Sequence, residues 1–250
     1  MSHAVRCAVA LPVARITALL LAALTVSSCF RCGHERQSVV LFYEGAALRS
    51  SQGPKAESHL LRGLICTIGN GKSYVPIAIA YPFEGSVFPP EIVAPAFLWN
   101  DQGKGAELWM VAIGFDSSAT RIYILTNGTR PAPRLDSQCI RNNNRWEEPA
   151  RQAWTPDSGL WQAIKQRSRR GAAYVDIYGV ARAPEGKHIP VSHARITLHT
   201  SNDPVGAPIF YRDVPLMPIQ NTTGVIQPIS ENAVPLIAWR LRDIGRPSAP

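Results

Sequence analysis

The sequence predicts a mainly β protein, an immunoglobulin- or fibronectin-III-like antiparallel sandwich with one short inserted helix. Three observations predict it. Short apolar runs of β-forming residues recur from Tyr74 onward, Gly, Pro and Asn separate these runs, and one stretch has helical spacing. Many short strands joined by turns are typical of a sandwich or barrel. The range 74–244 is long enough to enclose one hydrophobic core.

The strongest strand signal is ELWMVAIGF, residues 107–115, in which alternate large apolar residues would share one face. TRIYILT (120–126) follows a polar turn, so the two runs are predicted to form a hairpin. HARITLHT (193–200) alternates cleanly, with Ala194, Ile196 and Leu198 pointing one way. Further strands are expected at 74–82, 97–99, 172–181, 209–216 and 236–243.

The one helix is predicted in TPDSGLWQAIKQRS, residues 155–168. Thr155 can cap it, and Pro156 suits its first turn. Leu160, Trp161 and Ile164 follow helical spacing. The basic residues at its end complement the helix dipole, which explains them without a ligand.

The first residues indicate export rather than fold. A basic head is followed by ITALLLAALTV (16–26), which is shorter than the roughly 20 residues that a membrane-spanning helix needs. A basic head, a short apolar run and the small-residue exit VSSC are typical of a signal peptide of the lipoprotein type, residues 1–28. Cys29 would then carry the lipid anchor, and the protein would face the periplasm or the cell surface. The alternative is an ordinary signal peptide cut nearby, with Cys29 as a plain thiol.

The remaining chain divides into a tether and preamble (29–73), the β-sandwich domain (74–244) and a tail (245–250). Within the preamble, 38–43 could form a short strand and LLRGLICTIGNGK (60–72) a strand that ends in a turn. In an oxidising compartment, Cys66–Cys139 is the disulfide to test first.

The charge balance is basic, with a formal net charge of +8 that falls to +6 without the leader, because 1–28 holds two arginines and no acid. Such a balance favours anionic partners such as lipid headgroups or acidic polymers. A solvated basic face is the alternative explanation. Nucleic acid is not expected as a partner of an exported protein.

No motif in the chain predicts catalysis or a cofactor. G-x-S-x-G and the phosphate-binding loops are absent, and CFRCGH (29–34) lacks the C-x-x-C-H spacing of haem attachment. His193 and His199, six residues apart on one strand, would lie about 20 Å apart and could not share a metal. Trp146 and Glu147, with Trp154 nearby, resemble the aromatic and acidic residues of sugar sites, so a glycan contact there stays open.

The stretch TSNDPVGAPIFYRDVPLMP (200–218) looks like a site because it holds two aspartates, an arginine and four prolines. Neighbouring residues on a strand face opposite sides, so Arg212 and Asp213 cannot pair with each other. A cross-strand pair, Arg212–Asp243 or Arg240–Asp213, is expected instead. The stretch is therefore interpreted as a bent entry into a late strand.

Four blocks in order, within 81–244, carry a resemblance: AYPFEGSVFPPEIVAPAFLW, WTPDSGLWQAIKQRS, TSNDPVGAPIFYRDVPL and PLIAWRLRDI. They resemble the N-terminal part of bacterial exported TolB-like or WD40-like propeller-repeat proteins with a c-type cytochrome motif. The resemblance implies a β-sandwich that precedes a haem segment and a propeller. This sequence contains neither C-x-x-C-H nor propeller repeats. Haem c is therefore expected only in a C-terminal part outside this chain. The chain would then be a piece of such a longer protein or a shortened relative of it.

Together these observations predict a non-catalytic, lipid-anchored binding or scaffold module, with the membrane and a protein or anionic polymer as partners. Two alternatives remain open. One is an accessory or truncated part of a periplasmic c-type cytochrome-like electron-transfer protein, and the other is a carbohydrate-binding or carbohydrate-active protein.

Overall fold

Strands dominate the part of the chain that the computed structural model describes, which comprises residues 39–44, 47–68, 73–103, 105–131, 152–214 and 231–246. The chain divides into two units, Met1–Glu35 and Arg36–Pro250, and every described residue belongs to the second. The mainly β prediction is confirmed. The expected leader (1–28) and Cys29 lie outside the described residues, as does most of the expected tail.

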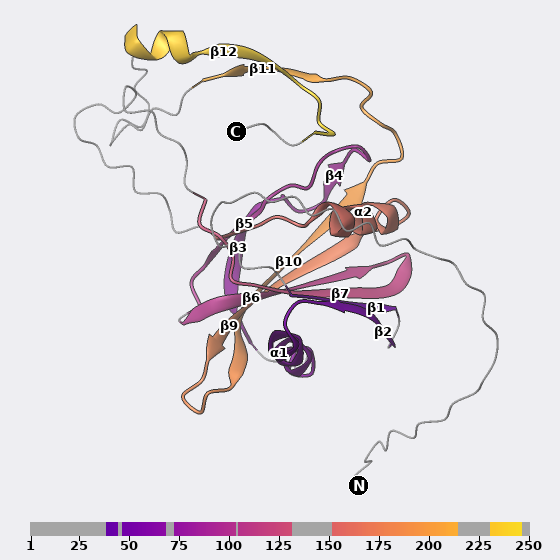
Figure 1. Cartoon of the computed structure of the whole chain (residues 1–250), viewed down its shortest axis with the longest axis vertical. Coiled ribbons are helices and arrows are strands. Elements are labelled where there is room, and N and C mark those ends of the chain that lie inside the picture. Colours follow the sequence, from indigo (N-terminus) through magenta and orange to yellow (C-terminus); the bar gives the residue numbers. More distant parts are fainter. Residues whose placement is uncertain are drawn as a thin grey trace, which may run out of the picture. The chain divides into compact units, whose positions relative to one another are not determined.

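Ten strands form one mixed, curled sheet (Figure 1). Its hydrogen-bonded order is β2-β1-β7-β6-β9-β10-β3-β5-β8, and β4 pairs with β10 beside this path. The strands are β1 Val39–Glu44, β2 Ala47–Gln52, β3 Val75–Tyr81, β4 Ser86–Phe88, β5 Phe97–Asp101, β6 Ala106–Phe115, β7 Ser118–Thr126, β8 Gln152–Trp154, β9 Ala173–Arg182 and β10 His188–Thr200. The predicted hairpin is confirmed as β6–β7. Whereas the sequence predicts antiparallel pairing throughout, β10 runs parallel to β3 and to β4.

Both faces of the central strands are buried, because side chains alternate along them. On β6, Trp109, Val111, Ile113 and Phe115 enter one hydrophobic cluster, as predicted, while Met110 enters a second cluster on the opposite face. The first cluster also holds side chains from β3, β5 and β9, so the curl of the sheet encloses a shared core. The predicted inward direction of Ala194, Ile196 and Leu198 is confirmed as well.

The second cluster lies beneath helix α1, Lys55–Ile65, which covers one face of the sheet (Figure 1). Two predictions for this segment were wrong: 60–65 is helix rather than strand, and 39–65 belongs to the folded domain rather than to a tether. The short strand expected at 38–43 is confirmed as β1. Leu61 and Leu64, three residues apart, place both side chains on the buried face of the helix. β1 pairs with β7 along its whole length, which joins this segment to the sheet.

Helix α2, Ser158–Arg167, confirms the predicted helix but not its cap. Asp157, not Thr155, caps it, since its carboxylate accepts a hydrogen bond from the Leu160 amide at 2.8 Å. Trp161 and Ile164 enter the first cluster. Lys165 is only 3% exposed and donates to the carbonyls of Pro90 and Ile92, so it does more than complement the helix dipole.

The last two strands stand apart from the main sheet. β11, Ile209–Asp213, and β12, Ala238–Arg242, form a separate two-stranded antiparallel sheet, which we call the ribbon. A 3-10 helix, η2, Glu231–Leu236, precedes β12. Sequence analysis predicted both strands but placed them in the sandwich with the others.

Candidate binding surface

The proposed glycan site is only partly within the described residues. Trp146 and Glu147 lie outside them. Trp154 ends β8 and is buried against Phe97, with ring centroids 5.5 Å apart. Its assignment as a glycan contact was therefore wrong, because a ligand cannot reach a ring enclosed in the core.

The proposed disulfide also extends beyond the described region. Cys66 follows the last residue of α1, where it is exposed and is bonded to no other cysteine of the described residues. Cys139 lies outside the described residues. The Cys66–Cys139 pairing therefore stays a prediction.

A carboxylate bonded by an arginine and a histidine lies between β9 and β10. Asp176 accepts hydrogen bonds from two Arg195 nitrogens, Nε at 2.8 Å and Nη2 at 3.0 Å, and from His193 Nε2 at 2.7 Å. Burial raises the pKa of the Asp176 carboxyl, but these hydrogen bonds outweigh it and hold the pKa below its usual value. The His193 ring also stacks on Tyr178 at 4.4 Å, so His193 is not simply a solvent-facing residue. A carboxylate so fully bonded is a poor general base, and we assign this cluster to strand pairing.

A second carboxylate joins three strands. Asp101 at the end of β5 accepts hydrogen bonds from Trp109 Nε1 and Ser192 Oγ, both at 2.8 Å, and from the Gly103 amide. Gly179 lies against this group, and a Cβ there would come within 2.1 Å of Ser192 Oγ. The cluster is a close-packed joint in the sheet, with no room for a substrate.

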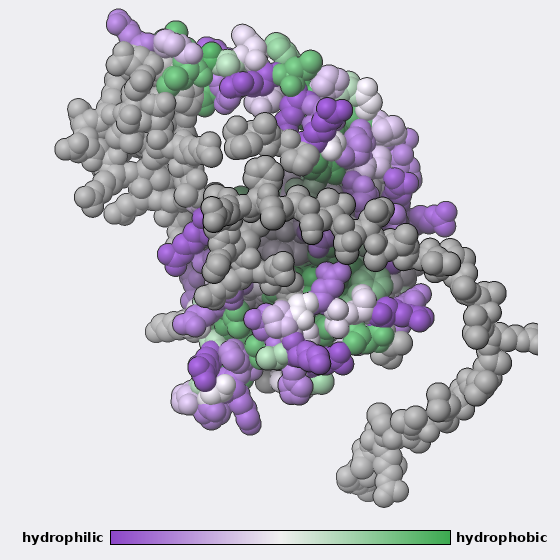
Figure 2. All heavy atoms as spheres, viewed as in Figure 1, coloured by the Kyte–Doolittle hydropathy of each residue, from purple (hydrophilic) through white to green (hydrophobic). Residues whose placement is uncertain are grey.

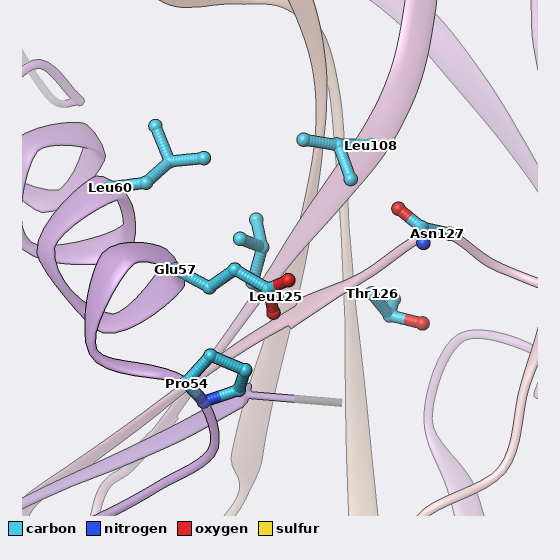
Figure 3. Close-up of a pocket in the computed structure, with 7 residues that line it drawn as sticks. All are labelled: Pro54, Glu57, Leu60, Leu108, Leu125, Thr126 and Asn127. Atoms are coloured by element: carbon cyan, nitrogen blue, oxygen red, sulfur yellow. The ribbon is translucent and has the colours of Figure 1, made fainter. Parts of the chain in front are cut away.

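A small pocket of about 340 Å³ lies between α1 and the ends of β6 and β7 (Figure 3). Its lining residues are Pro54, Glu57, Leu60, Leu108, Leu125, Thr126 and Asn127. Leucine side chains form much of its wall, and Glu57 is directed toward Leu125. Its polar side chains are a carboxylate, a carboxamide and a hydroxyl. These described lining residues include no histidine or second carboxylate that could complete an acid–base pair.

Exposed large hydrophobic side chains of the described residues concentrate on the ribbon and in the segments that flank it. Nine of the thirteen large hydrophobic side chains that are exposed lie between 205 and 241, on the ribbon and beside it. They are Val205, Ile209, Phe210, Tyr211, Val214, Val234, Leu236, Trp239 and Leu241. Isolated exposed apolar residues are ordinary, whereas a contiguous group marks a surface that contacts something else.

The register of the ribbon gives each face both apolar groups and arginine. Phe210 pairs with Leu241 and Arg212 with Trp239, so these four side chains share one face. Phe210 and Trp239 stack with centroids 5.0 Å apart, yet each remains 65% exposed. On the other face lie Ile209 and Tyr211 with the arginines of β12, Arg240 and Arg242. Figure 2 shows hydrophobic and hydrophilic side chains side by side along the ribbon.

One of the two expected charge pairs is present on the ribbon. Arg240 Nε lies 3.3 Å from Asp213 Oδ2, which confirms the Arg240–Asp213 prediction. The alternative Arg212–Asp243 pair is not formed: Arg212 is opposite Trp239, and Asp243 pairs with Arg246. The exposed Arg240–Asp213 pair contributes about 0–1 kcal/mol to folding stability.

One end of the ribbon, its base, is tied to the loop that follows β4 by the segments before β11 and after β12. Before β11, the Glu91 carboxylate accepts hydrogen bonds from the Val205 amide at 2.5 Å and the Gly206 amide at 3.3 Å. Burial raises the pKa of Glu91, but these amides help to hold it below its usual value. After β12, the Val93 amide donates to the carbonyl of Ile244 at 3.0 Å. The same loop is bound by Lys165, so these contacts link the base of the ribbon to α2.

The ribbon was missed as a site because its strands resemble core strands. IFYRD opens with three large apolar residues and AWRLR ends in alternating apolar residues and arginines, and such patterns normally indicate a partly buried strand. The available signal was that arginine occupies both faces of the pair, which a core-facing strand would not tolerate. This signal becomes visible only when the pairing register is known.

Across the described residues, no helix is long and apolar enough to cross a membrane, and no group of three His, Cys, Asp or Glu side chains is placed to hold a metal ion. Comparisons of the chain with family models, with curated proteins and with solved structures found no match.

Proposed function

We propose that this protein is an exported, lipid-anchored β protein without catalytic activity, which acts as a binding module through the ribbon. The observation that carries the proposal is the concentration of exposed apolar side chains on the ribbon, whose base is nevertheless tied to the domain. A rigidly based, unpartnered apolar surface suits contact with another molecule. The expected lipid on Cys29 would hold this surface close to a membrane.

We also propose that the curled sheet is a sandwich of the immunoglobulin or fibronectin-III type. β3 and β5 contribute to the same core cluster as β6, β7 and β9, which supports two facing layers. The parallel pairing of β10 departs from the all-antiparallel pattern of such folds.

The contact is tested in the membranes of the producing bacterium with the full chain. A photo-cross-linking amino acid replaces Trp239, and the matched control replaces Glu185, an exposed residue of the β9–β10 turn. A discrete adduct is expected from position 239 but not from 185, and it should weaken when Phe210→Ser is added. Equal labelling from both positions would refute a contact that is specific to the ribbon.

The anchor and the absence of haem are tested separately. Cys29→Ser should release the protein from washed membranes, and retention of this variant would contradict the lipid anchor. A visible spectrum of the purified full chain tests the electron-transfer alternative, and any Soret band would contradict a pure binding role.

A further inference from the structure

We infer that the partner of the ribbon is an extended, acidic segment of another protein, which adds to an open edge of the ribbon as a further strand. This inference rests on the proposed function and names the partner class for the same surface. Three properties of the ribbon lead to it: edges that pair with no other described strand, two similar faces, and arginines that have no carboxylate partner among the described residues.

The first property is that each strand of the ribbon has backbone N–H and C=O groups along one edge that no other described strand pairs with. Within the described part of the chain, β11 and β12 pair only with each other, so each strand leaves one edge without a paired strand. Two-stranded sheets are marginally stable by themselves, and an added strand supplies both backbone hydrogen bonds and apolar contacts. Adding an extended segment to a sheet edge is a general mode of peptide recognition.

The second property distinguishes a polypeptide strand from a membrane. Both faces of the ribbon expose apolar side chains: one face exposes Phe210 and Leu241, and the other exposes Ile209. A flat bilayer would cover one face and leave the other in water. A strand lies in the plane of the ribbon and sends alternate side chains to both faces, so it can contact both apolar groups at once.

The third property sets the charge of the partner. Arg212 has no carboxylate partner among the described residues, since Asp213 already pairs with Arg240. On the opposite face, Arg242 likewise forms no ion pair with a described carboxylate. A carboxylate is the strongest hydrogen-bond acceptor for a guanidinium group. We therefore expect the partner strand to present an acidic residue to each face.

The test uses the purified full chain with Cys29→Ser, so that no lipid contributes, and a peptide of sequence VEEVVEEV. This order gives each face of the extended peptide both valine and glutamate. The matched peptides are VKKVVKKV, which reverses the charge, and VEEPPEEV, which keeps all four glutamates while proline removes two backbone donors. Calorimetry should show binding of the first peptide only, and hydrogen exchange should show slower exchange of the β11 or β12 amides when it is bound.

The variants test the two arginines. Arg212→Gln/Arg242→Gln should weaken peptide binding roughly two- to thirtyfold, the effect of losing two cross-strand charge pairs. Arg182→Gln/Lys187→Gln removes the same charge from exposed positions around the β9–β10 turn and should leave binding unchanged. Circular dichroism matching that of the parent shows that each variant is folded.

Several outcomes would overturn the inference while leaving the proposed function in place. Equal binding of the glutamate and lysine peptides would refute an acidic partner, and undiminished binding of the proline peptide would refute strand addition. Binding to phosphatidylglycerol–phosphatidylcholine vesicles, with no peptide binding, would show that the ribbon contacts lipid. A concentration-dependent dimer that Trp239→Ser abolishes would show that a second copy occupies it. If position 239 also forms no adduct in membranes, the proposed function fails as well.

Discussion

Gly179→Ala should destabilise the protein strongly, although glycine-to-alanine changes within strands usually help. Gly179 lies on β9 opposite Ser192 of β10. A Cβ at position 179 would lie 2.1 Å from Ser192 Oγ and 2.2 Å from Asp101 Oδ2, far inside van der Waals contact. The new methyl group must therefore displace the Asp101 carboxylate, which holds β5 against β6 and β10.

The expected cost follows from the contacts that are lost. Overpacking a close-packed site costs about 1–3 kcal/mol. Breaking one hydrogen bond to the Asp101 carboxylate adds about 1.5–3 kcal/mol. Alanine recovers about 0.5–1 kcal/mol because it has less conformational freedom to lose than glycine. We expect a net loss of roughly 2–5 kcal/mol in the free energy of unfolding.

Urea unfolding of the full chain, followed by far-UV circular dichroism, measures this loss. Gly63→Ala in α1 is the matched control, since a Cβ there meets nothing within 4 Å, and it should stabilise the protein by about 0.5–1 kcal/mol. Adding Ser192→Ala to Gly179→Ala removes the nearest clashing atom, so the double variant should lose less than the sum of the single losses. A Gly179→Ala protein as stable as the parent would refute the close-packed joint.

Three further predictions concern the helices and the buried ion pair. Leu61→Ala should lower the free energy of unfolding by about 2–4 kcal/mol, because its side chain is fully buried on the inner side of α1. His59→Ala, on the exposed side of α1, should change it little. Equal losses for the two variants in urea unfolding would show that α1 is not packed on the sheet. Asp157→Ala should cost about 1 kcal/mol by thermal unfolding and Thr155→Ala much less, and the reverse order would contradict the observed cap. Asp176→Asn should lower the free energy of unfolding relative to the parent above about pH 4. This difference should shrink as the pH falls, because a carboxyl with a lowered pKa stabilises the fold only while it is ionised. A difference that does not change with pH would show that the charge of Asp176 does not matter.

Local alternation identified most of the main-sheet strands, and the apolar alternation of β6 correctly gave the face that enters the first cluster. It could not give their partners. β10 pairs with β3 and β4 in parallel, and no local signal in 75–88 or 188–200 specifies this contact. The opposite face of β6 is buried only because α1 covers it, so one-sided alternation understated how enclosed this strand is.

The candidate surface was harder to predict than the fold. A pairing register was needed to show that Phe210, Trp239 and Leu241 gather on one face, and β11 and β12 are far apart in sequence. The Arg240–Asp213 pair was predictable because charged residues at matching places on two strands attract each other. Exposure was not predictable, since the same apolar residues would also suit a core.

The position of β10 has a consequence for the timing of folding. Leu198 pairs with Ser86, more than 110 residues earlier in the chain, and β9 lies on the other side of β10. Until the segment 188–200 has been synthesised, β3, β4 and β5 lack the strand that joins them to the rest of the sheet. Contacts so distant in sequence make folding slow. Slow folding would suit the proposed export, because a chain that stays extended can be threaded across a membrane before its sheet closes.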